Sequence, residues 1–356
     1  YLIVRGVYII LFAKLLGVEL YGAYVYSQSW YILGVAVASW GTSELFIAEA
    51  ARATAAERRQ LAASGLSLRL LMGLVTIGAL ICIALLFEPD PDLRLLIIIY
   101  SQGVVVRGLG NWFSALFISQ ERSQYWLYIT VVFLTLEVVF ATILAMNGAG
   151  LVEIAIFQCT IWWLSLGASW LLYRRKFHTL PLAIYPRHLR FYLVNGVTLA
   201  TAMLVLSLLG PGLMIICRYF VEDATQLGEA AFVTQLIIIL GHMIRVISNS
   251  ALPQLNRPLP NREQRQIFFI STVWNQSIYL GGCAYILCNL LLPPLVSALV
   301  GDQFSGAARM FSQASWLLIP LLIMHGLRLV MISERQMRHY LFAILIGPLA
   351  LAAQVI

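Results

Sequence analysis

The sequence predicts an all-α polytopic membrane protein, and three observations lead to this fold class. Of the 356 residues, 61% are hydrophobic and only 11% are charged, whereas a soluble domain averages about 25% charged residues. The mean hydropathy is +0.86. Apolar runs of ~20 residues recur along the chain, and each could cross a hydrocarbon core of ~30 Å as a helix. We therefore expect the helices of this chain to lie in a bilayer.

Breaks in hydropathy divide the chain into about eleven predicted spans joined by short loops. No soluble domain is inserted between the spans. Both ends of the sequence lie inside apolar runs, so we expect a twelfth helix beyond the C-terminus. The predicted spans cover residues 1–16, 20–47, 64–87, 94–118, 124–147, 151–173, 191–220, 229–252, 266–290, 308–332 and 338–356.

The charge of the loops alternates along the chain. Loops after even-numbered spans carry cations such as Arg174, Arg175 and Lys176, and loops after odd-numbered spans carry acids such as Asp90 and Asp92. Short loops rich in Lys and Arg stay on the cytoplasmic side, so we expect a cytoplasmic N-terminus. This topology accounts for the net charge of +7, and a nucleic-acid partner is not expected.

Two similar polar turns lie six spans apart. Residues 118–126 read ISQERSQYW and residues 332–340 read ISERQMRHY. An even offset gives two halves of the same orientation, which is a parallel repeat. We therefore predict two six-helix lobes, residues 1–176 and 177–356. A second match at the same offset aligns Gly22 with Gly228, Gln28 with Gln235 and Gly34 with Gly241.

The segment that joins the two lobes, residues 174–190, mixes basic and apolar side chains. This pattern is typical of a segment that lies on a membrane surface. With the expected orientation, the segment would lie on the inner leaflet.

Three stretches carry a resemblance to a known family: LLGVELYGAY from Leu15, SWGTSELFIAEAAR from Ser39 and SNSALPQL from Ser248. With these the chain resembles the MOP superfamily, and within it the polysaccharide-biosynthesis flippases of the Wzx type. The resemblance implies a MATE-like fold of two six-helix lobes around a V-shaped cavity. It also implies transport of undecaprenyl-pyrophosphate-linked oligosaccharide repeat units, as in O-antigen or capsule assembly, across the bacterial inner membrane. Membrane lipids and other polysaccharide-assembly proteins are then candidate partners.

Two relatives within the superfamily stay open as alternatives. The lipid II flippase MurJ also uses a cationic cavity, so charge does not exclude it. A MATE-type ion-coupled exporter would need acids in its cavity to hold a cationic drug, and few acids lie deep in this sequence.

Deep charges are the candidate functional residues. Arg5, Arg107 and Arg245 lie far from the ends of their predicted spans, and His242 lies three residues before Arg245 on the same helix face. The one acid at similar depth is Glu137, within about one turn of the height of Arg107. Each such charge costs at least ~2.5–3.5 kcal/mol near the bilayer centre, so each needs a partner or a wet cavity. Glu137 is therefore either an ion-pair partner that joins two helices or a protonatable coupling site.

The resemblance implies that spans one, two, seven and eight line the cavity, which would place Arg5 and Arg245 there. Arginine suits phosphate because its planar fork presents several donors. We predict Arg5, Arg107, Arg245 and His242 as contacts of the pyrophosphate or sugars, with H⁺ or Na⁺ as the coupling ion. Cations nearer the span ends, such as Arg69, are expected to snorkel to the interface.

The seventh predicted span contains LLGPGLMII, with Pro211 between Gly210 and Gly212. Proline removes one backbone hydrogen bond and glycine permits bending, so a kink is expected. We predict a hinge here that lets the lobes alternate between two states, with a static kink as the alternative.

No sequence signature of an enzyme is present. The chain contains no GxxxxGK phosphate loop, no metal-ligand cluster and no Ser/His/Asp arrangement. We expect a transporter without a cofactor or metal, driven by an ion gradient or by substrate flow. The alternative from another class is a membrane glycan polymerase or ligase, which would need a larger external loop than any predicted here.

Overall fold

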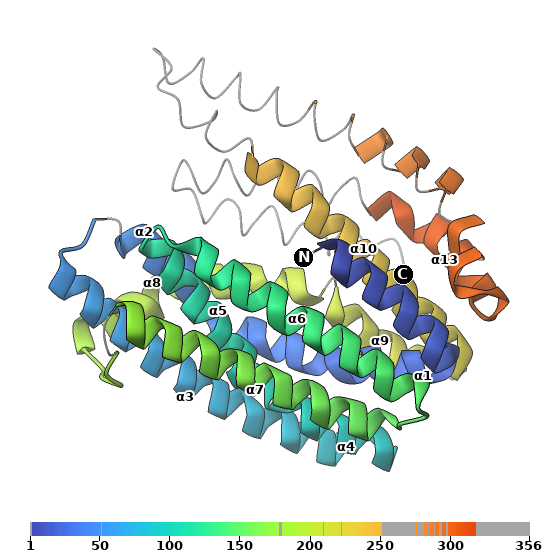
Figure 1. The fold of residues 1–356 in the computed structure, drawn as a ribbon, viewed down its shortest axis with the longest axis horizontal. Helices are drawn as coiled ribbons and strands as arrows, with labels where there is room; N and C mark the ends of the chain where they lie inside the picture. The colour runs from blue at the N-terminus through green and yellow to red at the C-terminus, as the bar shows by residue number, and fades with distance from the viewer. Residues whose placement is uncertain are drawn as a thin grey trace. The chain divides into compact units, whose positions relative to one another are not determined.

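The chain is helical throughout its described part. The computed structural model describes residues 2–250 except 51, 178–179, 209 and 222, scattered residues from 275 to 300, and residues 301–317 (Figure 1). No strand occurs among them. Seven of their helices are long and apolar enough to cross a membrane, and a bent pair between 281 and 300 would make eight. The all-α polytopic membrane class is confirmed, while the last three predicted spans lie wholly or partly outside the described residues.

The helices form two compact units, each described here by itself. The first unit comprises Ala23–Ile216, and the second comprises Leu2–Gly22 with Cys217–Ile356. Helix α1 (Leu2–Ser39) contributes to both, and its backbone is interrupted at Gly17, where φ is 77° and ψ is 169°. A positive φ is readily adopted by glycine, so this residue ends the first predicted span and lets the second begin.

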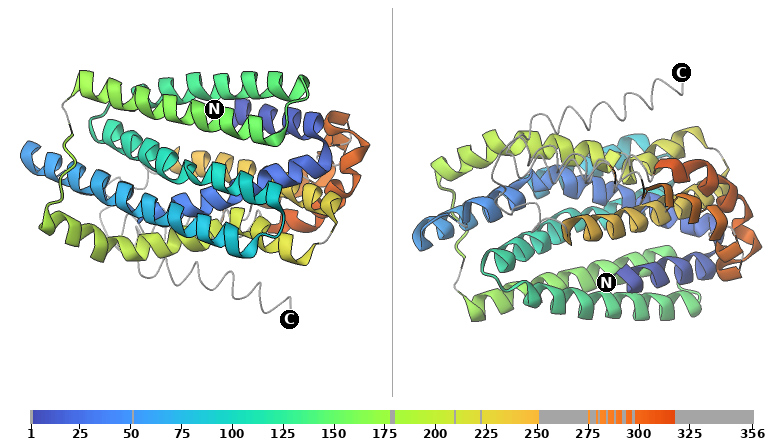
Figure 2. Two further views of the ribbon diagram at one scale, coloured as in Figure 1. Left: turned by 90° about the horizontal axis from the view of Figure 1, so that it is seen from below. Right: turned by 90° about the horizontal axis from the view of Figure 1, so that it is seen from above.

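The first unit is a bundle in which neighbouring helices lie side by side. Helix α6 packs on α7, α7 on α5, α5 on α3, and α3 on α8 (Figure 2). The unit thus includes α8, which the sequence placed after the lobe boundary at residue 176; that boundary stays a prediction. Its helices, besides the second part of α1, are α2 (Thr42–Ala50), α3 (Ala55–Phe87), α4 (Pro91–Ser101), α5 (Gly103–Ser119), α6 (Ser123–Met146), α7 (Leu151–Lys176), α8 (Pro186–Leu208) and the first part of α9 (Pro211–Phe220).

Local sequence signals set several helix ends. Thr54 and Glu57 form a reciprocal capping box at the start of α3, which satisfies two backbone donors. Asp90 caps α4 with its carboxylate, and Pro91 follows at the first helical position, where a missing N–H costs nothing. Between α5 and α6, the ISQER turn places Glu121 at φ 57°.

Two predicted spans are broken into shorter helices. The predicted span 94–118 agrees with one apolar segment, Pro91–Ser119, that is long enough to cross a membrane. A break at Gln102 divides this segment into α4, which ends at Ser101, and α5, which begins at Gly103. The predicted span 191–220 is also divided, since α8 ends at Leu208 and α9 begins at Pro211. Proline at the first position of a helix needs no hydrogen-bond partner for its nitrogen, so the second break lies where the sequence predicts a kink.

Aromatic side chains fill the core of the first unit at the end where α2 lies. Phe46, Trp112, Phe117, Tyr173 and Tyr192 are all buried in one cluster. The ring of Trp112 lies so close to Gly65 of α3 that a Cβ there would overlap it. The small residue thus lets α3 and α5 pack closely around a large indole.

The second unit joins the first part of α1 to α10 (Ala224–Ser250) and α13 (Ser305–Ala314). Tyr21, Phe232 and Phe304 form an aromatic cluster, with the two phenylalanine rings 5.1 Å apart. The buried carboxylate of Glu229 accepts a hydrogen bond of 2.7 Å from the backbone N–H of Gly306, in the first turn of α13. A carboxylate in this position satisfies a donor that the helix itself leaves open.

Candidate functional site

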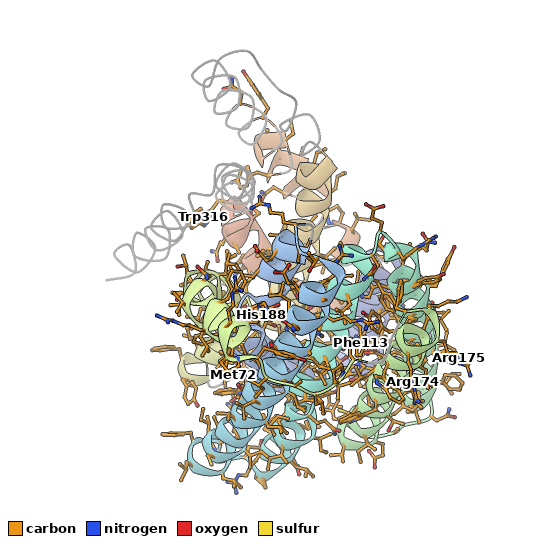
Figure 3. All side chains as sticks on the ribbon, turned by 90° about the vertical axis from the view of Figure 1, so that its left-hand side faces the viewer. Met72, Phe113, Arg174, Arg175, His188 and Trp316 are labelled. Carbon is orange, nitrogen blue, oxygen red and sulfur yellow. The ribbon has the colours of Figure 1, made fainter. Side chains whose placement is uncertain are left out.

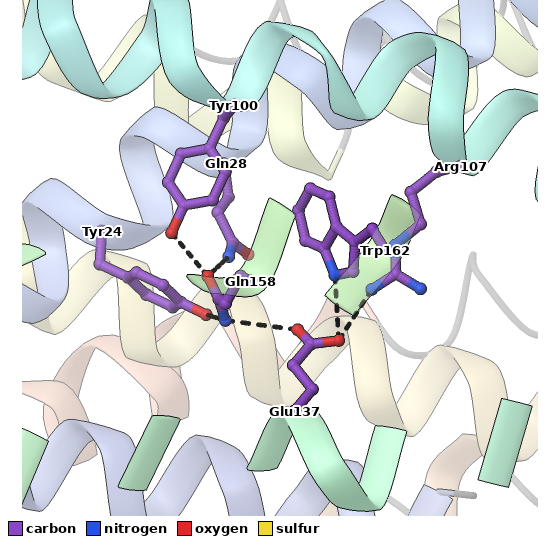
Figure 4. Close-up of polar contacts among 7 residues, drawn as sticks. All are labelled: Tyr24, Gln28, Tyr100, Arg107, Glu137, Gln158 and Trp162. Atoms are coloured by element: carbon purple, nitrogen blue, oxygen red, sulfur yellow. Dashed lines mark hydrogen bonds and ion pairs between the residues drawn. The ribbon is translucent and has the colours of Figure 1, made fainter. Parts of the chain in front are cut away.

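Glu137 lies in α6 and is buried in the first unit, where both of its carboxylate oxygens accept hydrogen bonds (Figure 4). Arg107 of α5 donates through Nη2 to Oε2 at 3.1 Å, and Trp162 of α7 donates through Nε1 to the same oxygen at 3.0 Å. Gln158 of α7 donates through Nε2 to Oε1 at 3.3 Å. The charge of the carboxylate is therefore met by one cation and two neutral donors.

Gln158 links this carboxylate to three further polar side chains. Its Oε1 accepts from the hydroxyl of Tyr100 at 2.6 Å and from Nε2 of Gln28 at 3.2 Å, and its Nε2 also donates to the hydroxyl of Tyr24 at 2.8 Å. A buried amide has both donors and acceptors, so it can join a carboxylate to hydroxyl groups. The network connects α1, α4, α5, α6 and α7.

The ion pair lies at the edge of the network. The side chain of Arg107 is 40% exposed, whereas that of Glu137 is 7% exposed. The guanidinium also lies 4.5 Å from the ring centroid of Trp162, close enough for a cation–π interaction. The cation thus stabilises a buried carboxylate that would otherwise pay a large desolvation cost, while remaining partly accessible.

The break between α4 and α5 lies beside the network and leaves room for it. A Cβ at Gly103 would lie 2.8 Å from the indole of Trp162 and 3.0 Å from the ring of Tyr31. Side chains satisfy carbonyl groups freed by the break: Ser101 Oγ donates to Ile98 O at 2.7 Å, and Cys159 Sγ lies 3.6 Å from Ile99 O. Such compensation is required at membrane depth, where no water replaces a lost backbone hydrogen bond.

The structure brings together Arg107 and Glu137 but does not describe all of the other predicted site residues. Arg5 lies in the part of α1 that belongs to the second unit and is partly buried. His242 and Arg245 lie in α10, but their side chains fall outside the described part of the chain. The predicted substrate contacts of these three residues therefore stay predictions.

The predicted hinge residues lie at the helix break described above. Pro211 and Gly212 are buried in the first turn of α9, and a Cβ at Gly212 would lie 3.0 Å from Cδ2 of Leu208. Gly210 lies between the two helices, and its carbonyl accepts from the N–H of Leu213 at 3.1 Å. The backbone is interrupted here, and movement about this break stays a prediction.

The prediction that Arg69 snorkels to the interface is wrong. The residue is 4% exposed, and its guanidinium donates to Thr42 Oγ1 at 2.6 Å, Ser43 Oγ at 2.7 Å and Gly108 O at 2.7 Å. Its Cζ atom lies 5.2 Å from the ring centroid of Trp112. The guanidinium therefore points into the bundle, where these acceptors satisfy it, rather than toward a membrane interface.

Neutral polar residues of the network were missed by the sequence predictions. Gln158, Tyr24 and Tyr100 are neutral, and neither charge nor spacing marks them as partners of Glu137. One signal was available for Gln28, which aligns with Gln235 in the predicted repeat. Among the described residues, no group of three His, Cys, Asp or Glu side chains could hold a metal ion.

Comparison with known proteins supports the fold and leaves the subfamily open. No protein-family model and no curated protein matches the chain. A solved structure described as an inward-facing conformation of a multidrug resistance MATE family transporter of the MOP superfamily is similar, with a TM-score of 0.70 at 12% sequence identity. The match covers 97% of this chain and 85% of that one. The chain is thus a multi-pass membrane protein with the fold of a MATE family transporter.

Proposed function

We propose that this chain is a flippase that moves undecaprenyl-pyrophosphate-linked oligosaccharide repeat units from the cytoplasmic to the periplasmic leaflet of a bacterial inner membrane. Transport would proceed by alternating access, without enzymatic turnover of the substrate. Fold alone does not establish function, so the proposal also depends on the charges within the apolar helices.

The observation that carries the proposal is the charged network inside a fold that a known transporter shares. Arg107 is held 3.1 Å from Glu137 in a bundle of apolar helices, and 40% of its side chain is exposed. Ionisable groups at membrane depth are costly and typically mark a transport path or a coupling site. A purely structural bundle would be more stable with apolar side chains in these positions.

The nature of the substrate is inferred from the balance of deep charges. The sequence places Arg5, Arg107 and Arg245 deep in apolar segments and only Glu137 as a comparably deep acid. Such a balance favours an anionic substrate, and the guanidinium group matches the geometry of phosphate oxygens. A pyrophosphate between a lipid tail and sugars has this chemistry.

Glu137 is the proposed coupling site, with H⁺ as the ion that its surroundings favour. While ionised, the carboxylate only accepts hydrogen bonds, and Gln158, Trp162 and Arg107 all donate to it. Protonation of Glu137 would turn one carboxylate oxygen into an O–H donor that faces these N–H donors. It would also weaken the attraction between Glu137 and Arg107. The hydrogen bonds that join five helices would then need to rearrange, which could link proton binding to a conformational change.

A second candidate function is ion-coupled export of a cationic compound. The solved structure with the similar fold is described as a multidrug resistance transporter, and a buried carboxylate such as Glu137 is a group that such transport could use. The two candidates differ in the charge of the substrate, so transport assays with an anionic lipid and with a cationic dye can separate them.

The test is transport by the purified full-length protein in liposomes, with a fluorescent polyprenyl-pyrophosphate oligosaccharide in one assay and a cationic dye in another. We expect wild-type protein to flip the lipid, and Arg5→Ala or Arg245→Ala to slow flipping at least ten-fold. Arg122→Ala removes an exposed cation at the start of α6 and should leave the rate unchanged. Transport of the dye but not of the lipid by wild-type protein would contradict the proposal and favour export.

A further inference from the structure

A short segment, residues 177–185, connects α7 to α8, and we name it the strap. The structure describes all of it except residues 178–179, and 180–185 have no regular secondary structure. Both flanking helices are long and apolar enough to span a membrane. The strap therefore connects two spans at the membrane surface, where water and headgroups can satisfy its backbone.

One side of the strap is fixed to the helical bundle. The N–H of Tyr185 donates to Oγ of the fully buried Ser64 at 3.1 Å, and Oγ of Ser67 donates to the carbonyl of Ala183 at 3.3 Å. Leu180 packs against the aromatic core of the first unit. These contacts hold the strap along α3 and set which of its side chains point outward.

Two large apolar side chains of the strap are exposed. Leu182 is 67% exposed and Ile184 is 53% exposed, while Ala183 between them is bound to α3 through its carbonyl. Side chains alternate between the two sides of an extended backbone. This alternation presents Leu182 and Ile184 together on the outer side.

Basic residues flank these two apolar residues on both sides in the sequence. Residues 174–190 contain five Arg or Lys residues and no Asp or Glu. Figure 3 views the first unit from this end and labels Arg174, Arg175 and His188. Glu49 and Glu57 are the acids that influence His188, and both belong to other helices. The five cations, all exposed, are Arg174, Arg175, Lys176, Arg187 and Arg190.

Helix capping explains only part of this charge. Arg174, Arg175 and Lys176 lie in the last turn of α7, where cations interact favourably with the helix dipole. Arg187 and Arg190 lie near the start of α8, where the dipole disfavours a cation. Glu57 of α3 lies close enough to attract Arg187, so one acid of this chain faces these two cations and room for a further anion remains.

We propose that the strap and its flanking cations form a binding site for anionic phospholipid headgroups. Leu182 and Ile184 would enter the boundary between headgroups and acyl chains, and the five cations would contact the phosphates around them. The predicted topology places the site on the inner leaflet. Trp170 supports the assignment, because Arg174 lies 5.5 Å from its ring centroid and such aromatic side chains are enriched at membrane interfaces.

The charge is tested by comparing two triple variants of the full-length protein. Arg174→Gln/Arg187→Gln/Arg190→Gln removes three of the cations that flank the strap, and Arg52→Gln/Arg59→Gln/Arg122→Gln removes three exposed cations outside the segment. Phosphatidylglycerol and phosphatidylcholine binding would be measured by native mass spectrometry at several salt concentrations. We expect the strap variant to bind phosphatidylglycerol about five-fold or more weakly, and the control variant to bind it as wild type does.

The position of the strap is tested with spin labels at residues 182, 183 and 184 in phosphatidylglycerol nanodiscs. Labels on Leu182→Cys and Ile184→Cys should be accessible to oxygen and protected from a water-soluble nickel reagent. The label on Ala183→Cys serves as the control for alternation and should be less accessible to oxygen. Other cysteines would be replaced in all three variants.

Two results would overturn the proposal. Equal weakening of phosphatidylglycerol binding in the two triple variants would show a general effect of positive charge and no specific site at the strap. Labels at 182 and 184 that are open to the nickel reagent would place the strap in water, as expected of a surface that binds an acidic protein segment instead. Neither measurement depends on transport, so the outcome is independent of the proposed flippase activity.

Discussion

At the residue scale, Gln158 determines how the charged pair is connected to the rest of the first unit. It is fully buried, and its amide makes four hydrogen bonds, to Gln28, Tyr100, Tyr24 and Glu137. A hydrocarbon side chain of similar size would leave those partners with unmet hydrogen-bonding capacity. Buried polar networks are favourable when every member is satisfied and unfavourable when one is removed.

We predict that Gln158→Leu destabilises the folded protein by about 2–3 kcal/mol, since unsatisfied buried polar groups cost about 1–3 kcal/mol each. The measurement is thermal unfolding of purified protein followed by tryptophan fluorescence. Thr160→Val is the matched control on the same helix, because Thr160 is exposed and bonds only locally, to Ile156 O. Equal unfolding temperatures for the two variants would show that the network contributes little to stability.

At the element scale, a close helix crossing in the described part of the second unit joins α1 to α10. A Cβ at Gly22 would lie 2.9 Å from the backbone of Gly228, and a Cβ at Gly228 would overlap the carbonyl of Val18. Small residues allow backbones to approach closely within membranes. The same two glycines are equivalent in the repeat predicted from the sequence, and equivalent residues of two parallel halves would meet only near a two-fold axis.

Gly228→Ala should destabilise the second unit, because the added methyl group meets a backbone carbonyl that cannot move without shifting α1. Overpacking of this kind costs about 1–3 kcal/mol. Gly241→Ala is the control on the same helix: a Cβ there meets nothing within 4 Å, and alanine favours helix over glycine by about 1 kcal/mol. We expect opposite shifts in the thermal unfolding temperature; a decrease of equal size in both would contradict the close crossing.

Helix ends and breaks were predictable from the sequence where a residue such as proline itself restricts the backbone. Pro211 between two glycines predicted the break between α8 and α9, whereas the cap that Thr54 and Glu57 form at the start of α3 was not predicted. The break at Gln102 was missed because its compensation comes from Ser101 and from Cys159 on another helix. Tertiary contacts of this kind have no local signal in a single sequence.

At the scale of the whole molecule, composition and hydropathy were sufficient for the fold class, whereas only the charged part of the candidate site could be anticipated. Arg107 and Glu137 were paired because two charges at equal depth in apolar helices each need a partner. Gln158, Tyr24 and Tyr100 cost far less to bury, so many arrangements were open to them. Arg69 was misplaced because its position along the helix does not tell whether its side chain faces an interface or polar partners on neighbouring helices, here Thr42, Ser43 and Gly108.

The predicted topology requires the two ends of α6 to lie on opposite sides of the membrane. This helix has 24 residues, or about 36 Å, enough to cross a hydrocarbon core of about 30 Å. Ser123 at its start and Asn147 just after its end are both exposed. The loop charges predict that Ser123 is cytoplasmic and Asn147 external.

We therefore expect Asn147→Cys to react with a membrane-impermeant maleimide in intact spheroplasts, and Ser123→Cys to react only after the membrane is permeabilised. All five native cysteines would first be replaced, because Cys82 and Cys283 are exposed. The two variants are matched controls for each other, since they differ only in which end of one helix carries the thiol. The reverse pattern would invert the topology and move the strap to the outer leaflet, while labelling of both thiols in intact spheroplasts would show that α6 does not span the membrane.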